Sequence, residues 1–258
     1  MQEKRVKITW YGTASVRLTA GSSQLLIDPF FPFADSSVKV PADAYEGCSN
    51  ILVSHGHFDH IGSIKDLVRD DTAVYCTKAP YQTLCRKGVS RNNLHLISVG
   101  DVFSIGEFRI TAYNGKHIKL SGWDCIKKAF SKRVLQNRKG IWGKLKKITS
   151  CLEKKETLCY LIEACGKRIL ILGSLALADN ENYPTGADIV FFPYQDSEDI
   201  FNLALSVFEK LKPQAVLLTH FDDTFPPFST ETDTSDIEEH LKKNAAVYKL
   251  SHGGSVEL

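Results

Sequence analysis

Four potential metal ligands stand within six residues in the first quarter of the chain. The segment Ser54–Ile64, SHGHFDHIGSI, contains His55, His57, Asp59 and His60 directly behind an apolar run. Neutral imidazole is a preferred ligand of zinc and other late divalent metals, and two histidines two residues apart in an extended turn can direct both rings to one ion. The aspartate and the third histidine fall near the start of a helix and point to a neighbouring position. The pattern therefore predicts that this segment supplies part of the ligands of each of two adjacent metal sites.

An ordinary polar loop with Asp59 as a helix cap is the alternative interpretation of this segment. It requires three of the eight histidines in the chain to gather there without a shared role. We therefore favour the metal site.

Strands and helices must position these side chains. Alternating apolar and polar residues predict an antiparallel meander of strands over 6–10, 15–19 and 24–28. A buried strand over 51–54, a helix over 61–68 and a strand over 73–76 then form a βαβ unit. We expect further strands over 108–112, 158–162, 168–172, 188–192, 215–219 and 246–250, and helices over 200–211 and 235–243. Strands followed by helices in both halves predict an α/β fold, a four-layer αββα sandwich with two sheets face to face.

The spacing H-x-H-x-D-H, behind an apolar strand and ahead of a helix, resembles the metallo-β-lactamase superfamily. The resemblance extends along nearly the whole chain, through Asp28 in LLIDPF, His117 in AYNGKH, Gly173 and Ser174 in ILILGSLAL, and His220 in VLLTHFDD. The fold of that family is the αββα sandwich. Within the superfamily the chain is similar to the small cytoplasmic hydrolases, including the ascorbate-6-phosphate lactonase branch and, because of its basic helices, the phospholipase-like N-acylethanolamine branch.

The resemblance implies two metal ions side by side, with water between them. Each ion would have three protein ligands, namely His55, His57 and His117 for one, and Asp59, His60 and His220 for the other. Asp28 would lie behind a ligand as a hydrogen-bond acceptor that fixes its orientation. We expect zinc, with manganese or iron as alternatives.

Ser174 departs from the family pattern, in which an aspartate at this position bridges both metals. Two divalent ions about 3.7 Å apart repel by roughly 18 kcal/mol at an effective dielectric near 20, and a neutral hydroxyl does little to offset this. The second ion should therefore bind more weakly. Asp179, Asp222 and Asp223 are alternative carboxylates for the bridge.

A metal ion lowers the pKa of its bound water from about 15.7 toward about 7 and polarises the scissile bond, so no side-chain nucleophile is needed. We therefore predict a metal-dependent hydrolase of an ester, lactone or phosphoester, in which Asp59 and the Ser174 hydroxyl hydrogen-bond the attacking water. A metal-binding sensor without turnover and a nuclease are the alternatives.

Positive charge is concentrated in one segment. Residues 116–156 contain 13 Lys and Arg against 3 Asp and Glu, whereas the whole chain has a net charge of +2. Apolar residues at helical spacing predict two amphipathic basic helices, over 126–135 and 141–152. We interpret 119–156 as an insertion into a single domain spanning 1–258.

This insertion suggests three roles: a lid, a surface for anionic lipid through 126–152, or a patch for an anionic small-molecule substrate. Lys116 and Lys119, beside His117, are candidates to hold an anionic group. A solvated outer face is the alternative, and nucleic acid is not the expected partner.

The composition is that of an ordinary globular protein, with 43% apolar residues in 258. No apolar leader or membrane-length apolar run is present, and the seven cysteines form no C-x-x-C pair, so we expect a cytoplasmic protein with reduced thiols.

Overall fold

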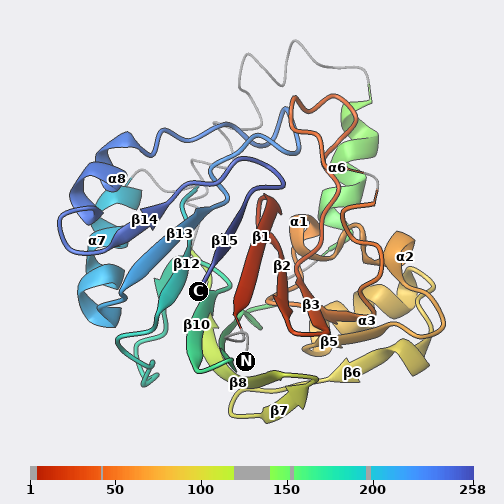
Figure 1. Cartoon of the computed structure of the whole chain (residues 1–258). Coiled ribbons are helices and arrows are strands. Elements are labelled where there is room, and N and C mark those ends of the chain that lie inside the picture. The colour runs from red at the N-terminus through yellow and green to blue at the C-terminus, as the bar shows by residue number, and fades with distance from the viewer. Residues whose placement is uncertain (1–4, 42, 119–139, 152–153, 196–198) are drawn as a thin grey trace.

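The computed structural model describes residues 5–258 except 42, 119–139, 152–153 and 196–198. Its strands form two sheets that pack face to face, with helices on the outer sides (Figure 1). The first sheet has the order β15-β1-β2-β3-β4-β5-β6. These strands are β1 Val6–Gly12, β2 Ser15–Ala20, β3 Ser23–Ile27, β4 Asn50–Leu52, β5 Ala73–Cys76, β6 Leu94–Leu96 and β15 Ser255–Glu257. The expected meander β1-β2-β3 is antiparallel, and β4 and β5 pair in parallel as the βαβ unit requires.

The second sheet has the order β11-β8-β9-β10-β12-β13-β14, with β7 paired to β8. Its strands are β7 Val102–Ile105, β8 Phe108–Lys116, β9 Leu158–Ala164, β10 Lys167–Leu172, β11 Ala176–Leu177, β12 Ile189–Pro193, β13 Ala215–Thr219 and β14 Ala246–Tyr248. From β10 to β14 every pairing is parallel, and the intervening helices cross over the outer face.

Helices cover both sheets. Those beside the first sheet are α1 Phe58–Ile61, α2 Ile64–Leu67 and α3 Lys78–Arg86; those beside the second are α7 Ile200–Leu211 and α8 Ser235–Leu241. Helix α6, Ile141–Thr149, lies at one end of the sandwich next to α1 (Figure 1). The predicted αββα sandwich is therefore confirmed.

Two apolar clusters hold these layers together. The larger one fills the space between the sheets and includes Trp10, Phe108 and Tyr160, which are fully buried. The second, with Ile51 and Ile61, lies between the first sheet and its helices. Because β4 contributes to both clusters, both faces of that strand are buried, and the loop that follows it starts from a fixed point.

The local predictions differ from the structure in a few places. In place of the helix predicted over 61–68 there are two short helices, α1, which ends at Ile61, and α2, which begins at Ile64. Residue 62 between them must be glycine, because an added Cβ would lie 2.5 Å from the carbonyl oxygen of Phe58. The helix predicted over 141–152 is α6, whereas the one over 126–135 lies outside the described residues. The single-domain boundaries and the insertion stay predictions. Among the described helices, none is long and apolar enough to cross a membrane.

Candidate metal centre

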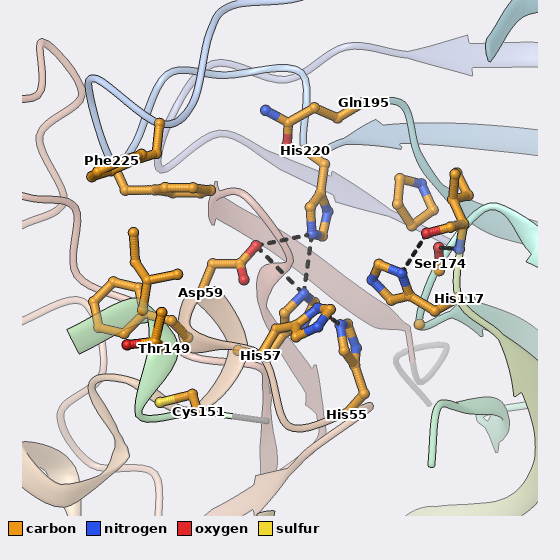
Figure 2. A pocket seen from close by; sticks show the side chains of 17 residues that line it. His55, His57, Asp59, His117, Thr149, Cys151, Ser174, Gln195, His220 and Phe225 are labelled. Atoms are coloured by element: carbon orange, nitrogen blue, oxygen red, sulfur yellow. Dashed lines mark hydrogen bonds and ion pairs between the residues drawn. The ribbon is translucent and has the colours of Figure 1, made fainter. Parts of the chain in front are cut away.

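Five histidines gather at one end of the sandwich, and four of them lie in loops that directly follow the end of a strand. The loop 53–57 leaves β4, His117 directly follows β8, and His220 directly follows β13. His60 and Asp59 lie on the short helix α1. Figure 2 shows the side chains of His55, His57, Asp59, His117 and His220 converging on one cavity, which His60 also lines.

Three imidazoles form the first ligand group. One nitrogen from each of His55, His57 and His117 lies within 4.8 Å of the other two. His55 Nε2 is 3.1 Å from His57 Nδ1. The other nitrogen of His117, Nδ1, is 2.7 Å from the carbonyl oxygen of Ile118, so it donates there and Nε2 is left as the ligand atom.

A carboxylate and two imidazoles form the second ligand group. His60 Nε2 is 3.3 Å from His220 Nε2, and Asp59 Oδ2 is 3.6 Å from the first and 3.8 Å from the second. Ligand atoms about 2.1 Å from a tetrahedral ion are separated by roughly 3.4 Å. The three atoms therefore already stand at the spacing of ligands around one metal ion, and the donor types fit it.

Asp28 lies behind the second group and reaches the first through Ser54. Its Oδ2 accepts a hydrogen bond from His60 Nδ1 at 2.8 Å and another from the Ser54 hydroxyl at 2.5 Å. The oxygen of that hydroxyl is 3.0 Å from His55 Nδ1, which can donate to it. One buried carboxylate thus orients a ring in each group and directs its Nε2 to the cavity. The structure places Asp28 where an orienting acceptor is expected. The role of Ser54 was not predicted, because no feature of the sequence distinguishes it within the histidine segment.

Two residues of this network have left-handed backbone conformations. Asp28 has φ 44° and His220 has φ 61°. Such conformations cost about 1–3 kcal/mol and persist where surrounding contacts hold them. The amide of Asp28 donates to Leu52 O, and that of His220 donates to Thr13 O, each at 3.0 Å. The strain thus occurs at the two points where a strand must turn sharply to aim a side chain at the site.

The electrostatics prepare most of the ligands for a cation. Burial, and then the nearby His60, lowers the pKa of His55 well below its usual value and that of His220 to about 4. Burial alone would raise the pKa of Asp59, but His60 and His220 outweigh it and lower that pKa. His60 is the exception, since Asp28 and Asp59 outweigh its burial and raise its pKa. Neutral imidazoles and an ionised carboxylate are the forms that bind metal.

Ser174 lines the cavity beside His117, and its Oγ accepts the amide hydrogen of Ile118 at 3.1 Å. The preceding Gly173 lets this turn pass close to β9 and to the loop after β4, because a Cβ there would lie 2.4 Å from Leu158 O and 3.1 Å from Ser54 Cβ. Ser174 therefore lies next to the first ligand group, at the sequence position where the family pattern has a bridging aspartate.

The three alternative carboxylates have partners elsewhere. Asp179 is exposed and pairs with Lys116 at 2.9 Å. Asp222 accepts the Thr13 amide and pairs with His252. Asp223 accepts the Ser229 hydroxyl. None of the three belongs to either ligand group of the described residues, so the structure offers no replacement for the bridge among them.

The cavity beside the ligand groups has a volume of about 360 Å³. Besides the predicted residues, its walls contain a set that sequence reasoning missed, chiefly Phe58, Ile148, Thr149, Cys151, Gln195, Phe225 and Phe228. Figure 2 shows Phe225 and Thr149 on one side of His57 and His220. His117 and Ser174 lie on the other side. No sequence motif marks these residues, because they come from four separate segments that only the fold brings together.

The chain is similar to a known protein family and to curated relatives. The family model described as beta-lactamase superfamily domain matches residues 23–221. A UPF0173 metal-dependent hydrolase of Methylobacterium nodulans is 34% identical over 116 residues, which are 43% of this chain and 48% of that protein. The chain thus spans about half the length of the curated relatives it matches.

Two solved structures have the same fold at low sequence identity. The metallo hydrolase Igni18 of Ignicoccus hospitalis has a TM-score of 0.63 and 16% identity, with 98% of each chain covered. The metallo-beta-lactamase fold protein YhfI of Bacillus subtilis has a TM-score of 0.63 and 14% identity, with 99% of this chain and 100% of the other covered. These likenesses bear on the arrangement of the strands and helices.

Proposed function

The chain belongs to the beta-lactamase superfamily, and from that premise we propose that it is a metal-dependent hydrolase of an ester, lactone or phosphoester. The observation that supports this most directly is the triangle of His60, His220 and Asp59, whose ligand atoms are 3.3 to 3.8 Å apart at the edge of a cavity. A second set of three nitrogens adjoins it. The cavity supplies room for a substrate beside both.

A bound metal supplies an activated water at neutral pH and a Lewis acid for the scissile bond. The residues of the chain hold and orient the reactants. Asp28 and Ser54 fix the ring orientations of His60 and His55. We assign Asp59 and Ser174 to the attacking water, since both line the cavity, and the Ser174 oxygen that accepts from Ile118 still has an O–H to donate.

Zinc is the metal that we propose, with manganese and iron as alternatives. Five imidazoles and one carboxylate make up the two groups, and a set rich in nitrogen favours zinc over magnesium or calcium, which prefer oxygen. Cytoplasmic location remains a prediction.

Elemental analysis combined with a hydrolysis assay tests the proposal. Protein purified without added metal should contain zinc, and hydrolysis of generic esters or phosphodiesters should stop on chelation and return on adding zinc. His240→Ala on helix α8, away from the cavity lining, is the control that should change neither. Tight ligand binding without turnover would favour a sensor instead, and salt-dependent binding of an oligonucleotide would favour a nuclease.

A further inference from the structure

Apolar side chains form part of the cavity wall. Phe225 and Phe228, from the loop after β13, and Ile148, from helix α6, line the cavity and are each only partly buried. Figure 2 shows the Phe225 ring beside the open space in front of Asp59. These side chains thus present apolar surface to the cavity in addition to what they bury in the protein.

Fixed positive charge is missing from the lining residues that the structure describes, since they include neither lysine nor arginine. Two lysines on neighbouring segments have partners outside the cavity lining. Lys116 pairs with the exposed Asp179, and Lys144 binds Asp35 and the carbonyl oxygen of Pro226. Recognition of a phosphate group usually relies on arginine or lysine side chains, or on the amides of a helix N-terminus. The polar groups on the walls away from the ligands are instead neutral: Thr149, Cys151 and Gln195.

We propose that the site takes a neutral carboxylic ester, open or cyclic, whose apolar acyl group packs against Ile148, Phe225 and Phe228. This rests on the proposed function and narrows its substrate class. In the reaction the oxygen of water bonds to the acyl carbon, the bond from that carbon to the alkoxy oxygen breaks, and the alcohol leaves with a proton as the carboxylic acid forms. The anionic substrate expected from the basic segment stays the competing prediction.

Acyl chain length is the variable that tests this proposal. With the full-length, metal-loaded protein, kcat/KM for p-nitrophenyl acetate, butyrate and hexanoate should rise about four-fold per added methylene until the cavity is full, from the transfer free energy of one CH₂. Bis(p-nitrophenyl) phosphate should be the poorer substrate. A preference for the phosphodiester, or rates independent of chain length, would overturn the assignment of the substrate class and leave the metal-dependent hydrolase intact.

Two variants of helix α6 distinguish a specific contact between Ile148 and the acyl chain from a general effect of changing this helix. Ile148→Ser should flatten the dependence of kcat/KM on chain length, because it removes apolar surface from the wall and so lowers the hexanoate value more than the acetate value. Leu145→Ser is the matched control, since Leu145 lies one turn away, is 37% exposed and is absent from the cavity lining. An equal effect of the two changes would contradict a specific acyl contact.

Binding measurements decide the question even without turnover. Calorimetry with acetohydroxamate, hexanohydroxamate and phenylphosphonate on the metal-loaded protein should give the tightest binding for the hexanoyl compound, and Ile148→Ser should remove that advantage. If no ester or phosphoester is hydrolysed, the proposed function fails, while this series still tests the apolar wall. If the phosphonate binds more tightly than either hydroxamate, the apolar wall of Ile148, Phe225 and Phe228 does not determine specificity.

Discussion

The two ligand groups lie side by side but differ in charge. The first consists of three imidazoles, from His55, His57 and His117, whereas the second contains the carboxylate of Asp59. Asp28 also touches the second group directly, through His60, and reaches the first only by way of the Ser54 hydroxyl. Among the described residues, two carboxylates therefore lie beside the second ligand group, whereas no carboxylate belongs to the first group or bonds to it directly. This difference in charge indicates that the two groups should bind metal ions with different affinities.

This difference changes the expected order of affinity. The serine at position 174 alone suggested that the ion beside Asp59 would be the weaker, because no bridge offsets the repulsion between ions. The geometry favours the opposite order. A divalent cation next to two ionised carboxylates is stabilised by charge, whereas one held by three imidazoles depends on coordination alone.

The largest effect is expected from removing the charge that distinguishes the groups. Asp59→Asn keeps the size of the side chain but replaces the carboxylate, so metal content after gel filtration should fall below about 0.2 ion per chain and hydrolysis should fall by more than about 100-fold. His57→Ala should leave close to one tightly held ion in the second group. Elemental analysis of both variants decides the order. Retention of the tight ion in Asp59→Asn but not in His57→Ala would reverse our assignment.

Asp28→Asn should have the next largest effect and should act on both groups. Asparagine tolerates the left-handed backbone at this position, so the change removes charge without adding strain. Loss of such an outer partner costs about 10- to 100-fold in metal affinity. Zinc affinity measured by competition with a chromophoric chelator should fall within that range, and an unchanged affinity would show that Asp28 only supports the fold.

Ser54→Ala should produce a smaller and more selective effect. It removes the link between Asp28 and His55, while His60 keeps its own hydrogen bond to the carboxylate. A neutral hydrogen bond contributes about 1 kcal/mol, so the weaker ion should lose roughly five-fold in affinity and the tighter ion less. Titration of the two sites separately checks this. An equal loss at both would mean that the serine acts on the two groups together.

Much of the fold and of the ligand set could be predicted from the sequence, because the patterns that specify them lie in short continuous segments. Period-two alternation predicts β1 to β3, and the histidine segment behind β4 contains four of the six ligand positions in one loop. The strands that sequence reasoning missed include β6, β11 and β15, which have only two or three residues and are set by pairing with a neighbour. Periodicity needs more residues than these strands have.

The parts of the site that were missed depend on contacts between distant segments. Ser54 gains its role only when Asp28, 26 residues away, is beside it. The apolar wall combines Ile148 with Phe225 and Phe228, and no spacing links those positions in the chain. Likewise, Asp179, Asp222 and Asp223 looked equally suitable as bridges, because sequence does not reveal the partners that hold them away.

The smallest expected effect concerns Ser174, which lines the cavity beside His117. Ser174→Asp introduces a carboxylate where the family pattern has a bridge, and one of its oxygens can keep the hydrogen bond from Ile118. The added charge offsets part of the repulsion between two ions and favours the imidazole group most, since that group has no carboxylate of its own. At a low, buffered concentration of free zinc, metal content should rise from about one ion per chain toward two, while the affinity of the tighter ion changes little. The rate need not increase, because a bridging carboxylate competes with the attacking water for the same space. If wild type already retains two ions through gel filtration, and Ser174→Asp leaves that number unchanged, the inequality between the groups does not exist and the charge argument is wrong.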